Sequence, residues 1–401
     1  MASSGVEVRQ APATDVTRTG LATGAALVLP AALSGLAQTG LAPVLPRIEQ
    51  AFAGEPFAAT LTRFLATAIG LSMVFGAPLA GRLGSHVGRR PVLIAATLLF
   101  GIAGSAGLLL GSLPALAVSR IALGLAMATI GTMITTIITL HFQDPMRHRW
   151  LGYYSLTGTI AVMIIIPLSG WLGAINWRAP FAMHLIAFPL AVLFFLALPR
   201  DAETARRHVA GVGSVNGSRV PLGLILFATS CGCLTGGGPL FLPFRAAETG
   251  VHDPRTIALL LLPQVAGAAV TAFCFGRIRQ HLSQRATFLF AFATIASAFL
   301  VVGTVPLFGV LMLGTAISGF GTGVITPNLF AMAANFGRDA DRARTVGVIY
   351  GAFFAGPFAA QLILEPLVQR VGASAGLIGL AAIAGLLGCA QSFGKPALRS
   401  D

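Results

Sequence analysis

The chain has 401 residues, of which 55% are hydrophobic and only 10% are charged, and its mean hydropathy is +0.83. A soluble protein of this length needs far more charge to cover its surface, so the composition excludes that class. The net charge is +13, but the basic residues lie between apolar runs and not in one patch or tail, which argues against a nucleic-acid-binding protein.

Twelve long apolar runs follow one another, and each is long enough to cross a bilayer as a helix. The sequence therefore predicts an all-α membrane protein with twelve transmembrane helices embedded in the lipid bilayer. In chain order the expected spans are about 21–43, 60–80, 91–111, 113–140, 151–173, 180–198, 221–243, 256–275, 286–303, 309–333, 345–365 and 371–392.

Polar segments divide these spans into two groups of six. Residues 199–220 are polar, basic and rich in glycine, which is typical of a linker between two bundles. The expected organisation is an N-terminal tail over 1–20, a six-helix bundle over 21–198, the linker over 199–220, a second bundle over 221–393 and a C-terminal tail over 394–401.

The two halves repeat one another at an offset of 195 residues, which superimposes GRLGSHVGRR (81–90) on GRIRQHLSQR (276–285). The same offset pairs Gly124 with Gly319 and Arg147 with Arg342. One offset that holds in three separated segments indicates a parallel duplication, in which the bundles are related by an axis along the membrane normal.

Arginine placement predicts the orientation. If the N-terminus lies inside, the inner segments carry most of the 26 Lys and Arg residues, and six remain for the outer loops: Arg47, Arg63, Arg178, Arg245, Arg255 and Arg370. Cytoplasmic loops are enriched in basic residues, so we expect both termini in the cytoplasm and the protein in the cell (inner) membrane.

The segment 81–90 is predicted to be a tight, basic, cytoplasmic turn between two helices. It resembles the loop between helices 2 and 3 of the major facilitator superfamily, whose pattern G-x-L-x-D-x-x-G-R-R is matched at Gly81, Leu83, Gly88, Arg89 and Arg90. Ser85 replaces the acidic residue. The resemblance implies a cytoplasmic gate formed by these residues, in which Asp144 pairs with Arg89 and retains part of the lock.

A charged residue lies within the fourth span. Arg120, Gly124 and Ala128 resemble the helix-4 pattern R-x-x-x-G-x-x-x-A of the same superfamily. In drug–proton antiporters the matching arginine is linked to proton coupling, and an intramembrane charge is usually functional. The alternative is an arginine that reaches outward to the membrane surface.

Proton coupling by a deep carboxylate is not expected, because none of the 13 acidic residues lies deep in a predicted span. Candidate coupling residues are Arg120, His184 and Glu365, the last at the outer end of its span. A cationic cavity without carboxylates favours neutral or anionic substrates.

Isolated polar residues in apolar runs are the candidates for a substrate cavity between the two halves: Gln38, Thr39, Arg120, Gln264, Asn328 and Gln361. Gly124, Pro167, Gly170 and Gly319 are expected at close helix contacts. No spacing of histidine and cysteine suggests a metal site, and we expect no cofactor.

The resemblance to twelve-helix drug–proton antiporters implies a secondary transporter that exports small organic molecules, works by alternating access, couples to protons and is a monomer. Uptake or facilitated diffusion of an anionic or neutral metabolite remains an alternative, as does a sensor or assembly protein on the same fold. An enzyme is not expected, since no nucleophile–base pair or metal cluster is present.

Overall fold

The computed structural model describes residues 21–142, 146–198, 220–334 and 339–393. Apart from short turns and loops these residues form helices, and twelve of the helical segments are long and apolar enough to cross a membrane. Each predicted span corresponds to one of them. The expected tails over 1–20 and 394–401, and the linker except Val220, lie outside the described residues.

The first six spans form one bundle. Its helices are α1 (Leu21–Val28), α2 (Pro30–Thr39), η2 (Ala42–Val44), α3 (Leu45–Ala51), α4 (Ala58–Val87), α5 (Arg89–Ser105), η3 (Ala106–Leu108), α6 (Leu113–His141), α7 (Met146–Ile175), η4 (Ala179–Ile186) and α8 (Ala187–Ala197). The α1–α2 junction falls at Pro30, which lacks the N–H that an uninterrupted helix would need there.

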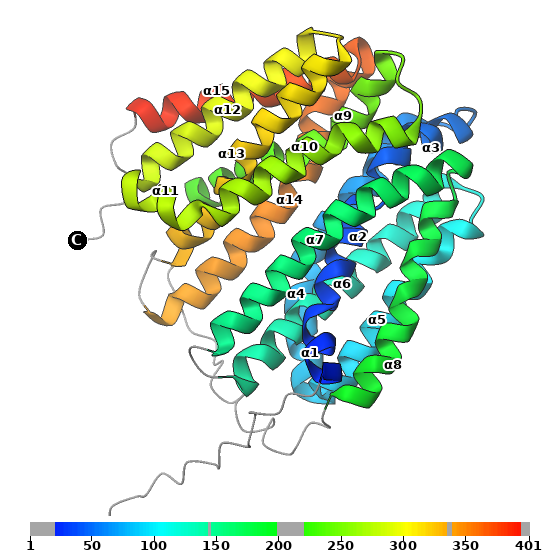
Figure 1. Ribbon diagram of the computed structural model, residues 1–401, viewed down its shortest axis with the longest axis vertical. Helices are drawn as coiled ribbons and strands as arrows, with labels where there is room; N and C mark the ends of the chain where they lie inside the picture. Colours follow the sequence, from blue (N-terminus) through cyan, green and yellow to red (C-terminus); the bar gives the residue numbers. More distant parts are fainter. Residues whose placement is uncertain (1–20, 143–145, 199–219, 335–338, 394–401) are drawn as a thin grey trace, which may run out of the picture.

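The other six spans form the second bundle, which Figure 1 shows in yellow-green to red beside the first. Its helices are α9 (Leu222–Glu248), α10 (Pro254–Phe273), α11 (Phe275–His281), α12 (Gln284–Thr304), α13 (Phe308–Ala334), α14 (Asp339–Val371) and α15 (Ala373–Phe393). The bundles meet along two seams, where α4 packs against α14 and α7 packs against α10.

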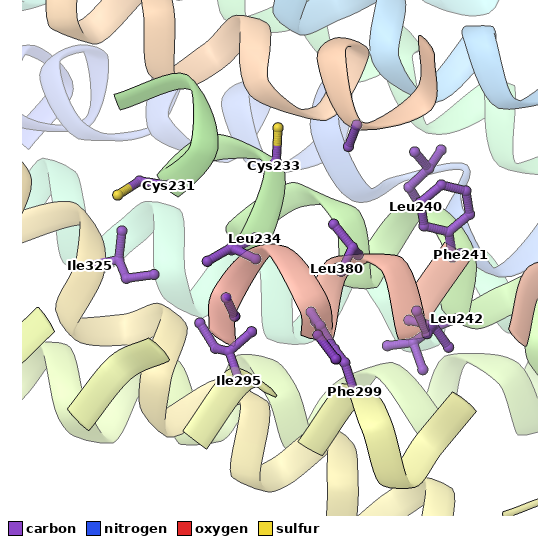
Figure 2. Packing of buried hydrophobic residues seen from close by; sticks show 14 of the residues in the cluster. Cys231, Cys233, Leu234, Leu240, Phe241, Leu242, Ile295, Phe299, Ile325 and Leu380 are labelled. Atoms are coloured by element: carbon purple, nitrogen blue, oxygen red, sulfur yellow. The ribbon is translucent and has the colours of Figure 1, made fainter. Parts of the chain in front are cut away.

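Each bundle has its own apolar core. In the C-terminal bundle, Leu234 and Phe241 of α9, Ile295 and Phe299 of α12 and Leu380 of α15 belong to one buried cluster, which Figure 2 shows. Cys231 is buried in the same cluster. A third apolar cluster joins both halves, because Phe244 and Ala373 pack with the η2–α3 region. We call that side of the molecule the closed end, and the side where α8 ends and α9 begins the linker end.

The internal repeat is visible in equivalent backbone contacts. A Cβ on Gly124 of α6 would lie 2.8 Å from the carbonyl oxygen of Ile69 on α4, and one on Gly319 of α13 would lie 2.3 Å from that of Gln264 on α10. Gly124 and Gly319 are 195 residues apart in the sequence, and so are Ile69 and Gln264. These positions need glycine, because any side chain would force the two helices apart.

The basic stretch 81–90 is mostly helical, which corrects the predicted turn. Helix α4 continues to Val87 and α5 begins at Arg89, so the turn consists of Gly88 alone, with φ 104° and ψ 150°. That backbone conformation disfavours residues with a Cβ. Gly84 is part of helix α4 and faces α6, where a Cβ would meet the Met133 side chain at 2.8 Å.

Helices α14 and α4 are longer at the closed end than the sequence suggested. Helix α14 runs to Val371, so Glu365 lies inside a helix and not at its end. Helix α4 begins at Ala58, so Arg63, which the sequence assigned to an outer loop, lies within the helix and is 7% exposed. The predicted span 345–365 ended early because Gln369 and Arg370 lower the hydropathy there.

Candidate functional site

A cavity of about 170 Å³ lies between the two bundles. Its walls come from both halves: α2, η2, α4 and α6 on one side, and α9 and α14 on the other. The lining is mainly apolar, with Leu65, Ile69, Leu240, Phe353 and Phe354 among its residues. A site shared by both halves can be exposed to either end when the bundles rock against one another.

Arg120 of α6 supplies the positive charge of this cavity. The residue is only 1% exposed, and its guanidinium lies over the Phe181 ring at 4.8 Å. None of its three side-chain nitrogens has a hydrogen-bond partner among the residues that the structure describes. Arg120 therefore does not extend to the membrane surface. Burying a cation without partners costs free energy. Binding of a hydrogen-bond-accepting or anionic group from outside the described residues would offset that cost.

The cavity also has a small set of neutral polar groups. Gln38, Thr39, Thr67 and Thr235 belong to its lining, and no carboxylate does in the described part of the chain. The sequence predicted Gln38 and Thr39 but missed Thr67 and Thr235, because a single threonine in an apolar helix is too common to stand out.

The C-terminal bundle has an uncharged residue at the position equivalent to Arg120. The residue 195 positions after Arg120 is Thr315, which is fully buried and whose Oγ1 donates to the carbonyl of Met312 in its own helix. Among the described lining residues, the positive charge of the cavity therefore comes from the N-terminal bundle alone.

A polar network joins α4 and α14 at the closed end. The Nη1 atom of Arg63 lies 2.7 Å from Oε1 of Glu365, and both side chains are nearly buried, at 8% and 10% exposure. Thr60 and Gln369 donate to the same carboxylate oxygen at 2.8 and 3.2 Å. The guanidinium of Arg63 also lies 5.1 Å from the centre of the Phe244 ring.

Gln361 continues this network toward the cavity. Its side-chain oxygen accepts a hydrogen bond of 2.6 Å from Thr67, and its side-chain nitrogen donates to the carbonyl of Thr60 at 3.0 Å. Gln361 was predicted to face the cavity, whereas the structure uses it to tie the bundles together. Breaking these bonds is a condition for opening the closed end.

The sequence analysis missed Thr60, Arg63 and Gln369 as members of this network, although a signal was available. Residues 60, 63 and 67 share one face of α4, and residues 361, 365 and 369 share one face of α14. Two polar stripes at helical spacing in two apolar helices indicate a shared contact, although the pattern does not say which helices pair.

Two other predicted cavity residues do not line the cavity. Gln264 is 5% exposed within the C-terminal bundle, where it packs against Gly238. Asn328 is fully buried, and its Nδ2 donates to the carbonyl of Gln284 at 3.0 Å, which ties α13 to α12. Both side chains are therefore buried inside the C-terminal bundle and not in the cavity between the bundles.

His184 lies behind Arg120 and does not line the cavity. Its Nδ1 is 3.1 Å from the carbonyl of Phe181, its ring is 5.5 Å from that of Phe100, and it is fully buried. A Cβ on Gly104 would overlap the imidazole, so the ring fills the space that this glycine leaves. The contacts suit a structural residue that supports Phe181 beneath the guanidinium.

The predicted gate residues lie at the linker end. Ser85 donates to the carbonyl of Arg82 in its own helix at 2.7 Å, and Arg90 bonds the carbonyl of Phe195 at the end of α8. Arg285 makes the equivalent bond to Ser392 in the second half, at 2.6 Å. Asp144 lies outside the described residues, so its pairing with Arg89 stays a prediction.

Glycines bring the bundles close at the second seam. A Cβ on Gly170 of α7 would lie 2.6 Å from both the Ala258 Cβ and the Pro254 carbonyl oxygen of α10. Pro167 lies one turn earlier inside α7. In the described part of the chain, no group of three or more His, Cys, Asp or Glu side chains could hold a metal ion.

Comparison with known proteins identifies the family. The model of the Major Facilitator Superfamily matches residues 27–251. The chain is 26% identical to the tetracycline resistance protein, class D, of Salmonella ordonez over 88% of this chain and 93% of the relative. It is also 26% identical to the multidrug resistance protein MdtM of Salmonella typhimurium, over 63% of this chain and 64% of that protein.

A solved structure gives the same fold. A D-xylose-proton symporter aligns with a TM-score of 0.73 at 13% identity, over 94% of this chain and 98% of the other. The family match covers the bundle that carries Arg120, the α4 residues of the polar network and the 81–90 motif. From its twelve helices in two repeated bundles, its inter-bundle cavity and this match, the chain is a member of the Major Facilitator Superfamily and thus a membrane transporter, not an enzyme.

Proposed function

We propose that the protein exports small organic molecules by alternating access, with transport coupled to protons. The observation that carries this proposal is the buried Arg120 in a cavity walled by both bundles, because a transport site has to be shared by two parts that move. The similarity to tetracycline and multidrug resistance proteins favours export.

In this proposal the closed end faces the outside and the linker end faces the cytoplasm, as the arginine distribution predicts. The α4–α14 network keeps the cavity sealed from the outside while the substrate enters from the cytoplasm. Export then requires that the network opens and that the two bundles approach one another at the linker end.

Glu365 is the group through which we propose that protons act on this equilibrium. Its charge pairs with Arg63 across the seam, so a proton on the carboxylate removes the ionic part of the contact and favours the outward-open state. A hollow of about 690 Å³ at the closed end, lined in part by Arg63, Glu49 and Glu248, brings solvent close to the pair.

The test is transport in proteoliposomes with an imposed pH gradient, with tetracycline as the first probe of a wider panel of drugs. We expect accumulation on the acidic side that a protonophore abolishes. If no compound accumulates with the gradient, proton-coupled export is wrong for this protein.

Facilitated diffusion or uptake of an anionic or neutral metabolite is the second candidate. It is favoured by the cavity lining, which carries one cation and no carboxylate in the described residues. The same vesicles distinguish it, because a facilitator equilibrates its substrate at a rate that is independent of the pH gradient.

A further inference from the structure

The hydrogen-bonding groups of the cavity are unequally distributed between donors and acceptors. Thr39 donates its hydroxyl proton to the carbonyl of Gly35 at 2.8 Å, and Thr235 donates to that of Cys231 at 2.9 Å. Thr67 donates to Gln361 at 2.6 Å, and the Gln38 amide donates to the carbonyl of Ser34 at 3.3 Å. The oxygens of these four side chains retain lone pairs with which to accept.

Arg120 is the opposite kind of group. Its guanidinium carries five N–H donors and no acceptor, and no described residue receives a hydrogen bond from it. One of its faces is covered by Phe181, so the donors that remain lie at the edge of the guanidinium plane. A planar edge of parallel N–H groups fits the two oxygens of a carboxylate better than it fits a single neutral carbonyl.

From this arrangement we infer that the cavity binds a small organic carboxylate that also carries a hydroxyl or amino group. The carboxylate pairs with Arg120, and the hydroxyl or amino hydrogens meet the oxygens of Gln38, Thr39, Thr67 or Thr235. This inference rests on the proposed transport function of the same cavity and names its substrate class.

The dimensions of the cavity limit the size of the ligand. Its volume of about 170 Å³ is close to that of an engineered cavity of roughly 150 Å³ that accepts benzene. Leu65, Ile69, Leu240 and Phe353 supply apolar walls for a ring. A ligand with one aromatic or saturated ring therefore fits the cavity as it stands, and a larger one requires the bundles to separate.

Direct binding measurements on the purified, full-length protein in detergent test the inference. The probes are 4-hydroxybenzoate and its neutral isostere 4-hydroxybenzamide, at pH 7, where the acid is ionised. We expect the acid to bind at least about ten-fold more tightly, because the amide cannot replace the charge-assisted pair with Arg120. Equal affinities, or tighter binding of the amide, would overturn the inference.

An inorganic anion is the main alternative occupant. Chloride is therefore titrated at constant ionic strength while 4-hydroxybenzoate binding is followed. If physiological chloride displaces the acid completely, Arg120 holds an inorganic anion and the assignment to an organic carboxylate is wrong. We expect physiological chloride to change the affinity for 4-hydroxybenzoate less than two-fold.

Three variants locate the binding site. Arg120→Gln should lower the affinity for the acid about ten-fold or more and abolish the preference over the amide. Arg120→Lys should keep part of the preference because it retains the charge but not the planar edge. Arg82→Gln, a matched control at an exposed arginine of the linker end, should bind as the unmodified protein does.

A purely structural role for Arg120 predicts a different pattern. Since the guanidinium has no partner in the described chain, its replacement by glutamine should leave the melting temperature of the empty protein unchanged or raise it. A lowered melting temperature with an unchanged acid-to-amide ratio would contradict the inference. If the glutamine variant does not fold, the lysine variant and the acid–amide comparison on the unmodified protein still decide.

The same probes separate this inference from the proposed export. If the acid binds through Arg120 but no flux of it occurs in proteoliposomes, the site is correct and the transport proposal fails for that compound class. If neutral drugs are exported while the acid and the amide bind with equal affinity, the export proposal stands and the inferred substrate class is wrong.

Discussion

The ion pair across the α4–α14 seam leads to the sharpest prediction: Glu365→Gln should release the closed end. The amide of the variant can still accept hydrogen bonds from Thr60 and Arg63. The smallest expected loss in stability of the sealed state is therefore the difference between charge-assisted and neutral hydrogen bonds, about 1–2 kcal/mol. The largest expected loss in stability is about 3–5 kcal/mol, which is the cost of leaving the buried Arg63 guanidinium without its charged partner.

These energies decide which conformation dominates. Two conformations of a transporter differ by a few kcal/mol, and about 1.4 kcal/mol changes their ratio ten-fold. The variant should therefore shift the population toward separation at the closed end by about ten-fold or more.

Spin labels at Leu109 and Leu307 measure this change, since both are exposed, at 90% and 62%, and lie in loops of opposite bundles at the closed end. Cys274 and Cys389 are first replaced by serine, because neither is buried. Pulsed dipolar spectroscopy should show a longer distance in Glu365→Gln than in the unmodified protein.

The control for this experiment is Asp253→Asn, which removes a charge at the same end. Asp253 caps α10 by accepting from the backbone N–H of Arg255 and does not bridge the two bundles. Its distance distribution should match that of the unmodified protein. If Glu365→Gln also leaves the distribution unchanged, the ion pair does not hold the closed end and the reasoning is refuted.

Four further predictions concern the cavity, the gate and the second seam. Arg120→Ala should abolish accumulation driven by a pH gradient in vesicles while the protein stays folded, and normal accumulation would remove Arg120 from the mechanism. Lipophilic cations such as tetraphenylphosphonium should be poor substrates, since the described cavity lining has no carboxylate; robust efflux of that cation would contradict this. Ser85→Asp should shift labels at the linker end toward shorter distances, because an acidic residue there restores a charge for the gate, and an unchanged or longer distance would refute the role of this position. Gly170→Val should wedge α7 from α10 and lower thermal stability by several degrees, whereas Gly131→Val, where a Cβ meets open space, should have little effect; equal melting temperatures would show that the seam tolerates bulk.

Most of the fold could be predicted because hydropathy responds to the environment of whole helices. The twelve spans follow from apolar length alone, and the offset of 195 residues that aligned Gly124 with Gly319 reappears as equivalent backbone contacts. The stretch 81–90 was harder, because glycine and arginine usually mark a turn. Here Gly84 is helical and lies against Met133 of α6, where a side chain would not fit.

The site was predicted only in part, because a sequence gives the polarity of a side chain but not the direction in which it points. Arg120 and Glu365 were selected as charged residues in an apolar context. Arg120 lines the cavity, and Glu365 forms the ion pair between α4 and α14. Gln264 and Asn328 look equally unusual in the sequence, yet each bonds or packs within its own bundle. Arg63 was counted with the outer loops although it lies inside the predicted span 60–80, and the sequence does not show that its partner is Glu365, 302 residues away.

The contrast between Arg120 and Thr315 affects how the transport cycle can release its cargo. If a ligand is anchored to Arg120, it travels with the N-terminal half throughout the cycle, and the anchor is equally strong whichever end is open. Affinity can then differ between loading and unloading only through what the other half contributes, chiefly Thr235, Pro239 and Phe353. Selection for cargo identity should consequently act on the first repeat, and selection for release rate on the second.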